Sequence, residues 1–513
     1  MRKVWARKAQ GCITLYSTNG MEAERESQLT AVQALVRGRR REGSAVWVAL
    51  PLLVGLALRL WMLKEFFEVQ GDSLVYGGIA KNLLLHGRYA LIQPSGAMMP
   101  TIIRLPGYPL FLVACFKVFG MENYASAAWV QIALELAGGL LLADFARRVA
   151  PEKLGRWDGL RRGAAHCTLW LAMLCPFTAI YDVAPMSEGL TLFLVALALR
   201  SAARFRERAI WASALWFTFA VTYAALLRPD GALLAVALAP ALAVGLWRAD
   251  AAERKQRMRM GLVCVLVALA PFAVWTGRNW RVFHVFEPLA PHYATEPGED
   301  MHLGWKLWFK TWSLDFVSTF AVSWQVPDNE LDLSAVPARA FDSPRQYAET
   351  AALAAEYNRN EQEMTPALDA GFARLAKERI AADPLRFYVW LPLGRMADMW
   401  LRPRVENLPV DLDWWVYANH PDETRLSWAY LVLNLVYLAL AGAGLWLRPR
   451  LGRAMLAYFL LRSALLLTVG APEARYTIEC FPMIFALAGI ALYRFTYPVL
   501  LSVLKVKASA GNG

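Results

Sequence analysis

Four residues that follow the first long apolar segment combine an acid, an arginine and two phenols. Asp72 and Tyr76 come first, and Arg104 and Tyr108 follow further along the same polar stretch. A guanidinium group binds phosphate through two hydrogen bonds and never loses its charge. A carboxylate near arginine stays ionised and is suited to accept a proton. These residue types therefore predict phosphate binding combined with general-base catalysis.

Further ionisable residues stand at the ends of later apolar segments, and the topology described below places them on the same side of a membrane. Charged side chains near the hydrocarbon region are energetically costly, and they usually form ion pairs or serve a function. One hypothesis is therefore that these residues share a water-filled cavity. Arginines there could bind a lipid phosphate and stabilise it as a leaving group. The alternative, that each residue only anchors its helix end, stays open. The set comprises Asp72, Arg104, Asp182, Glu188, Arg228, Asp230, Arg278, Glu473 and Arg475.

The composition indicates that lipid is the main solvent of this 513-residue chain. Hydrophobic residues make up 57%, and apolar runs near the length of a membrane crossing recur with aromatic and basic edges. The net charge of +12 sits in short loops between these runs, which indicates membrane orientation rather than nucleic-acid binding. The six cysteines show no C-x-x-C spacing and predict neither a disulfide framework nor a metal site. We expect no metal ligands.

The predicted fold is an all-α polytopic membrane protein with about ten transmembrane helices. Residues 1–44 are polar and are expected to form a disordered cytoplasmic tail, and the run at 45–63 reads as a retained signal anchor. In the first extracytoplasmic loop, residues 64–123, two apolar segments are expected as juxtamembrane helices. Further crossings are expected at about 124–145, 163–181, 190–203, 210–227, 233–246, 262–275, 426–447, 456–469 and 481–497.

Charge parity supports this arrangement, because it places the three basic loops between the middle crossings on the cytoplasmic side. The domains are then the tail, a transmembrane catalytic half at 45–275, an extracytoplasmic region at 276–425, and C-terminal helices at 426–513. Within 276–425 we expect an amphipathic interfacial segment with three tryptophans and a soluble helical hairpin at 348–382. Residues 385–401 are ambiguous, with an interfacial or re-entrant helix favoured over a crossing. Both termini are predicted to be cytoplasmic, in an inner or plasma membrane.

The ordered motifs resemble those of GT-C glycosyltransferases that use polyprenyl-phosphate sugars, with protein O-mannosyltransferases and lipid A aminoarabinose transferases as the nearest branches. The first-loop match runs from Asp72 through Tyr76 to Arg104-x-Pro106-Gly107-Tyr108-Pro109. Later matches are Pro185-Met186-Ser187-Glu188, Arg228-Pro229, Arg278-Asn279 and Glu473-x-Arg475-Tyr476. The match is silent on most of residues 295–425.

The resemblance implies that Asp72 is the base that activates the acceptor and that Arg104 binds the phosphate of a lipid-linked monosaccharide. It further implies that Tyr76 and Tyr108 line the sugar or phosphate pocket. The other residues expected to bind substrate are Glu188, Arg228, Arg278, Glu473, Arg475 and Tyr476. The sequence departs from protein mannosyltransferases, which carry an acidic pair where Asp72 is followed by Ser73.

The expected reaction is an inverting transfer of one sugar to a hydroxyl group of an envelope glycan, a lipid or a protein, on the extracytoplasmic face. No cofactor is expected beyond the lipid-phosphate-linked donor, and the chemistry calls for no divalent metal. The expected partners are the bilayer, the donor and the acceptor, without nucleic acid. The alternative is a transporter or flippase of lipid-linked glycans, although no internal repeat of the kind such proteins often show is visible. A scaffold subunit is a third alternative.

Overall fold

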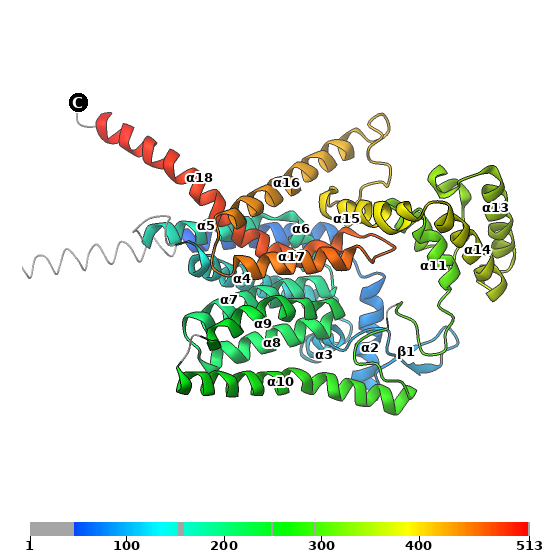
Figure 1. The fold of residues 1–513 in the computed structure, drawn as a ribbon, viewed down its shortest axis with the longest axis horizontal. Coiled ribbons are helices and arrows are strands. Elements are labelled where there is room, and N and C mark those ends of the chain that lie inside the picture. The colour runs from blue at the N-terminus through cyan, green and yellow to red at the C-terminus, as the bar shows by residue number, and fades with distance from the viewer. Residues whose placement is uncertain (1–45, 152–157, 248–249, 292, 511–513) are drawn as a thin grey trace, which may run out of the picture. The chain divides into compact units, whose positions relative to one another are not determined.

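The computed structural model describes residues 46–151, 158–247, 250–291 and 293–510. The predicted tail at 1–44 lies outside these residues. The chain divides into two units, residues 1–54 and 55–513, and the described part of the first unit is helical. In the described part of the second unit, helices dominate and a single two-stranded sheet is present (Figure 1). The predicted helical class is confirmed to that extent.

Helices coincide with each of the ten segments that were expected to cross the membrane. They are Val46–Phe66, α4 (Tyr124–Val149), α5 (Asp158–Leu174) with α6 (Pro176–Val183), α7 (Ser187–Glu207), α8 (Trp211–Leu227), α9 (Ala232–Trp247), α10 (Ala251–Phe283), α16 (Pro421–Trp446), α17 (Gly452–Leu466) and α18 (Phe481–Ala510).

Fewer of these helices have the length and composition of an independent crossing. Five described helical segments do, namely Val46–Phe66, α4, α10, α16 and Ala474–Thr496, and α5 with α6 would form a sixth if this pair, bent by 55°, is one span. The helix α8 has 17 residues, which at about 1.5 Å per residue falls short of a hydrocarbon core of about 30 Å. The count of about ten spans is therefore not confirmed.

The first loop contains the two expected helices and one element that was not expected. The helices are α2 (Asp72–His86) and α3 (Gly107–Phe119). Between them lies an antiparallel hairpin of β1 (Ala90–Ile92) and β2 (Met98–Pro100). The side chain of Asn82 in α2 donates to the carbonyl of Ala90 over 2.9 Å, which fastens the hairpin to the helix. The first loop therefore places the residues around Arg104 close to the beginning of α2.

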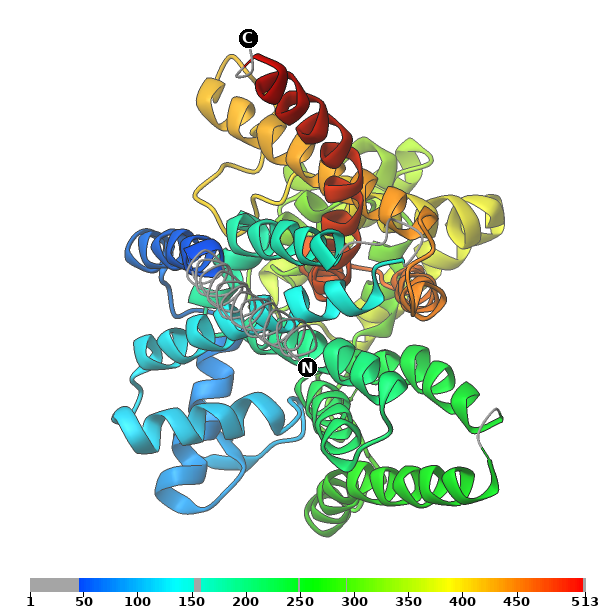
Figure 2. The same ribbon diagram turned by 90° about the vertical axis from the view of Figure 1, so that its left-hand side faces the viewer.

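The helices pack in two groups. In one, α7 packs on α4 and α8, and α8 contacts α9 and α10. In the other, α16 packs on α18, which also contacts α5. Figure 2 shows α8, α9 and α10 (green) gathered apart from α16 and α18 (orange and red). The helix α18 contacts α4 and α7 as well, and so joins the two groups.

The segment after α10 contains a small helical core rather than the interfacial tryptophan face that we expected. The helix α11 (Leu303–Lys310) packs on α14 (Pro366–Ala382), which pairs with α13 (Pro344–Arg359) as the predicted hairpin. Ser343 and Thr365 cap the last two helices, each followed by proline at the first helical position. Trp305, Trp308 and Trp312 are buried here against Phe372. The interfacial assignment of these tryptophans is wrong, because their apolar face meets other helices.

The ambiguous stretch at 385–401 forms a short helical element that is not among the candidate spans. Residues Arg386–Trp390 form a wide helical turn that continues into α15 (Leu391–Leu401). Arg395 is fully buried and donates to the backbone carbonyls of Lys310 and Ser313. An arginine that satisfies buried carbonyls in this way locks α15 to the end of α11.

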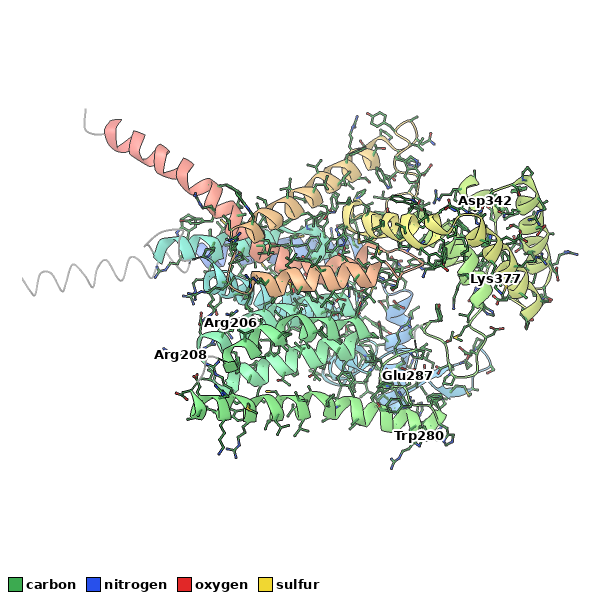
Figure 3. The ribbon with its side chains drawn as sticks, in the orientation of Figure 1. Arg206, Arg208, Trp280, Glu287, Asp342 and Lys377 are labelled. Atoms are coloured by element: carbon green, nitrogen blue, oxygen red, sulfur yellow. The ribbon has the colours of Figure 1, made fainter. Side chains whose placement is uncertain are left out.

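The long helices have two separate ends, and labelled residues mark each of them (Figure 3). In Figure 3, Arg206 and Arg208 lie at one end of the long helices, and Trp280 and Glu287 lie at the other. Asp342 and Lys377, on the small helical core after α10, lie toward the same end as Glu287.

Candidate active site

The aspartate that the sequence singles out begins the helix α2. Gly71 precedes it with a φ of 54°, a backbone conformation that glycine adopts without strain. Asp72 occupies the first helical position, where the positive end of the helix dipole stabilises a carboxylate. The turn and the helix therefore fix the position of Asp72.

Two arginines from distant parts of the chain hold this carboxylate. Arg104 donates to one oxygen of Asp72 over 2.6 Å, and Arg475 donates to the other over 3.1 Å. Arg104 lies between β2 and α3, whereas Arg475 lies on a short 3₁₀ helix, η7 (Ala474–Cys480). The side chains of Asp72, Arg104 and Arg475 are 25%, 23% and 23% exposed. The cluster is thus sheltered but still open to a ligand.

The arginines determine the charge of the Asp72 carboxyl. Burial by itself would raise the pKa of Asp72, but the charges of Arg104 and Arg475 and their hydrogen bonds outweigh it. The result is a pKa below the usual value of 3.8. Asp72 is therefore ionised at neutral pH, as a base must be.

Other predicted residues extend the cluster from Arg475. Glu473 pairs with Arg475 over 2.6 Å and also accepts a short hydrogen bond from the hydroxyl of Tyr476. Glu188, at the start of α7, lies 3.9 Å from Arg475 and accepts from Arg228 over 2.9 Å. The guanidinium groups of Arg228 and Arg475 both lie over the Tyr476 ring. The structure thus brings these residues together with Asp72.

The two predicted tyrosines of the first loop form an aromatic wall beside Arg104. The rings of Tyr76 and Tyr108 meet edge to face at 5.0 Å, and the guanidinium of Arg104 lies 5.9 Å from the centre of the Tyr76 ring. The hydroxyl of Tyr108 donates to Gln131 over 2.6 Å. Gln131 in turn donates to the backbone carbonyls at the end of α6. The sequence did not indicate that Gln131 contacts these residues.

A second group of charged residues lies behind Glu188, and the sequence indicated only part of it. Arg462, fully buried in α17, pairs with Asp230 over 2.5 Å and with Glu479 over 3.3 Å, and it donates to the carbonyl of Tyr476 over 2.6 Å. Arg228 also pairs with Asp230 and Glu479. An arginine in the middle of an apolar segment is itself a signal of pairing or function, and it could have revealed this layer.

Two residues of the expected set lie elsewhere. Arg278 donates to the carbonyls of Thr101 and Tyr89, each over 2.8 Å, and none of its contacts involves Asp72. Arg278 therefore stabilises the loop that contains the hairpin and does not contact Asp72. Asp182 forms an ion pair with the fully buried Arg59 over 2.7 Å, and this pair is separate from the Asp72 cluster.

Among the described residues, one group has donor atoms close enough to share a metal ion, namely Asp411, Asp413 and His420. It lies in the loop before α16 and includes no residue of the Asp72 cluster. The imidazole of His420 contacts both carboxylates, at 3.2 and 3.1 Å.

No protein-family model and no curated protein matches the chain. Solved structures do show similarity. ArnT from Cupriavidus metallidurans bound to undecaprenyl phosphate aligns with a TM-score of 0.37 and 16% identity, over 88% of this chain and 78% of ArnT. The archaeal oligosaccharyltransferase AglB from Archaeoglobus fulgidus, in complex with an inhibitory peptide and a dolichol-phosphate, aligns with a TM-score of 0.44 and 13% identity, over 91% of this chain.

The chain spans about half of AglB, namely 51% of its length. ArnT and AglB are GT-C glycosyltransferases, the superfamily that the motifs resemble.

Proposed function

We propose that the protein is a membrane glycosyltransferase that moves one sugar from a polyprenyl-phosphate donor to a hydroxyl acceptor. The observation that carries the proposal is a single ionised carboxylate, Asp72, held between Arg104 and Arg475 in a partly exposed, aromatic-lined site. One base and two phosphate-binding groups meet the needs of a displacement in which the leaving group is a phosphate. Such a group departs as an anion and needs no proton.

Each step of the proposed reaction can then be assigned to a side chain. The acceptor oxygen attacks the anomeric carbon and forms the new glycosidic bond, while the bond from that carbon to the phosphate oxygen breaks. The phosphate leaves with the bonding electrons, and Arg104 and Arg475 stabilise its charge. The acceptor proton passes to Asp72 as the bond forms. A single displacement inverts the anomeric carbon.

In this scheme the arginines change partners during the reaction. Both arginines bind Asp72, and this weakens the carboxylate as a base because its pKa is lowered. A donor phosphate offers them a competing anion with suitable geometry for bidentate binding. Arg104 and Arg475 would turn toward the phosphate and free Asp72 for the acceptor. Donor binding thereby prepares the base.

The compartment and partners follow from the sequence argument. Charge parity assigns the site to the extracytoplasmic face of an inner or plasma membrane, with both termini inside. The acceptor is an envelope glycan, a lipid or a protein, and the donor lipid arrives through the bilayer. The mechanism routes no step through a metal ion.

A binding and turnover experiment tests the proposal. In nanodiscs, Asp72→Asn is expected to bind undecaprenyl phosphate as tightly as the unchanged protein or more tightly, because the competing carboxylate is gone. The same variant should lose about 10²–10⁴-fold in transfer from undecaprenyl-phosphate sugars, the usual contribution of a general base. Arg104→Ala should weaken binding of undecaprenyl phosphate. Near-normal turnover by Asp72→Asn, or unchanged lipid-phosphate affinity in Arg104→Ala, contradicts the proposal.

A further inference from the structure

The backbone that leads into η7 is held by side chains from other elements. Residues 468–473, all within the described range 293–510, form neither helix nor strand, so regular structure supplies no partners for their carbonyl groups. From Thr468 to Tyr476, every second carbonyl instead accepts a hydrogen bond from a side chain of another element. The donors are Lys310, Ser313, Thr319, Arg404 and Arg462. This irregular segment is therefore held along its length.

Three of these donors follow one another in the small helical core, at the end of α11 and just after it. Their order in the chain matches the order of the carbonyls that they bind, so the two segments run side by side in the same direction. The contacts are those of Lys310 with the carbonyl of Thr468 over 2.9 Å, of Ser313 with that of Gly470 over 2.6 Å, and of Thr319 with that of Pro472 over 3.2 Å. The last two lie nearest to Arg475 in the chain.

The two hydroxyl donors belong firmly to the small helical core. Ser313 and Thr319 are both 0% exposed. In the chain they lie between Trp312 and Val322, two buried members of that core. Ala471, which stands between the two carbonyls that the hydroxyl groups bind, packs against the same core. The donors and the segment that they hold therefore move only with the core.

Two buried arginines hold the continuation of this segment in η7. Arg404 donates to the carbonyl of Ala474 over 3.0 Å, and Arg462 donates to the carbonyl of Tyr476 over 2.6 Å. Arg475 lies between these two residues, so the carbonyl groups on both sides of it have fixed partners. The backbone of Arg475 is thus held from the helical core on one side and from α17 on the other.

This backbone position decides what the Arg475 side chain can reach. Its guanidinium donates to Asp72 over 3.1 Å and pairs with Glu473 over 2.6 Å. In the proposed reaction it must also turn to the donor phosphate. Groups that take part in chemistry usually need to be held within about 0.5 Å of the productive geometry. A long, rotamer-rich side chain meets this demand only when its backbone is fixed.

We propose that Ser313 and Thr319 are positioning residues for the transfer reaction, because their hydroxyl groups hold the backbone that places Arg475 beside Asp72. The inference rests on the proposed function, in which Arg475 binds the donor phosphate. The small helical core is then part of the active site, since its displacement would carry Arg475 away from the acid.

The first measurement is amide hydrogen exchange of the purified full chain in nanodiscs. The hydroxyl-free variant combines Ser313→Ala with Thr319→Val, which removes both donors and nearly preserves the buried volume. Exchange in residues 473–477 should become at least about fivefold faster, the low end expected for two lost hydrogen bonds. Thr350→Val is the matched control and should leave it unchanged, because Thr350 is a buried threonine of the same core whose hydroxyl bonds to the carbonyl of Gln346 in its own helix.

The second measurement is affinity for undecaprenyl phosphate on the same samples. The hydroxyl-free variant should lose about three- to tenfold, whereas Thr319→Ser keeps its hydroxyl and should bind as the unchanged protein does. Arg475→Ala alone should lose about tenfold or more, as expected for a charged hydrogen-bond donor. Adding the hydroxyl-free substitutions to Arg475→Ala should change affinity by less than about twofold, because no guanidinium remains to be placed. A general loss of structure would instead lower affinity equally in both backgrounds.

The outcomes separate this inference from the proposed function. Unchanged exchange in residues 473–477 of the hydroxyl-free variant overturns the inference, and so does unchanged lipid-phosphate affinity. An equal loss of affinity with and without Arg475 overturns it as well. Full lipid-phosphate affinity in Arg475→Ala contradicts the donor assignment of the proposed function, and the exchange result then decides by itself whether the two hydroxyl groups hold the segment.

Discussion

Two aspartates that the sequence places on the same side of the membrane pair with arginine in opposite surroundings. Asp182 and Arg59 are both 0% exposed, and Arg59 donates further to the carbonyls of Gly55 and Met173. Asp72 and its two arginines are each about a quarter exposed. The residue types are the same, but only the open cluster can exchange one partner for a ligand. Exposure therefore separates the pair that holds helices together from the pair that is suited to chemistry.

The largest effect is expected where the buried pair is broken. Arg59→Ala leaves the buried carboxyl of Asp182 without its guanidinium partner, which should destabilise the protein by about 3–5 kcal/mol. The measurement is thermal or denaturant unfolding of the purified protein. As a control, replacing both partners together, Arg59→Met with Asp182→Leu, should recover most of the loss. Equal loss in the double variant would show that the pair is not a closed structural unit.

The open cluster should give the reverse result. Asp72→Asn should lower the transfer rate by about 10²–10⁴-fold, the usual contribution of a general base. Its free energy of unfolding should change by less than about 1 kcal/mol, because partly exposed pairs contribute little to stability. Turnover and unfolding are measured on the same preparation. A large loss of stability would place Asp72 in the same class as Asp182, and the comparison would fail.

A smaller effect is expected from the geometry of the phosphate contact. Arg104→Lys keeps the positive charge but loses the planar fork that grips two oxygens at once. Affinity for undecaprenyl phosphate should fall about tenfold, which is about 1.4 kcal/mol. Arg278→Lys is the matched control, because Arg278 bonds to backbone carbonyls away from Asp72. If Arg278→Lys weakens lipid-phosphate binding as much as Arg104→Lys, then both act through the loop and not on the phosphate.

The sequence predicts the helices well and predicts the site through topology. Parity places Arg104 and Arg475 on the side of Asp72, and the structure brings them within hydrogen-bond distance. The same argument cannot distinguish Arg278 from Arg104, because a side of the membrane does not specify a partner. Trp308 shows another limit. An apolar helix face looks the same in sequence whether it meets lipid or another helix.

Arg462 was missed for a related reason. It lies in the middle of an apolar segment, and periodicity says only that such a residue must find a partner. The partners, Asp230 and Glu479, come from other elements and become visible only after packing. The hairpin in the first loop has strands of three residues each, too short for a period-2 pattern to be recognised.

The smallest expected effect is an absence of pH dependence in the acid range. The pKa of Asp72 is lowered from 3.8 by Arg104 and Arg475, so its ion pairs stabilise the folded protein above that value and are lost only as pH falls through the still lower folded pKa. The ratio kcat/KM reports groups of the free enzyme. It should therefore stay level on the acid side from pH 7 down to about 4, near the usual pKa of an aspartate. The measurement is kcat/KM across that range, with unfolding followed at each pH. An acid limb with a midpoint near 6 in the folded protein would mean that the base is a different group, or that the arginines do not hold Asp72 before the donor binds.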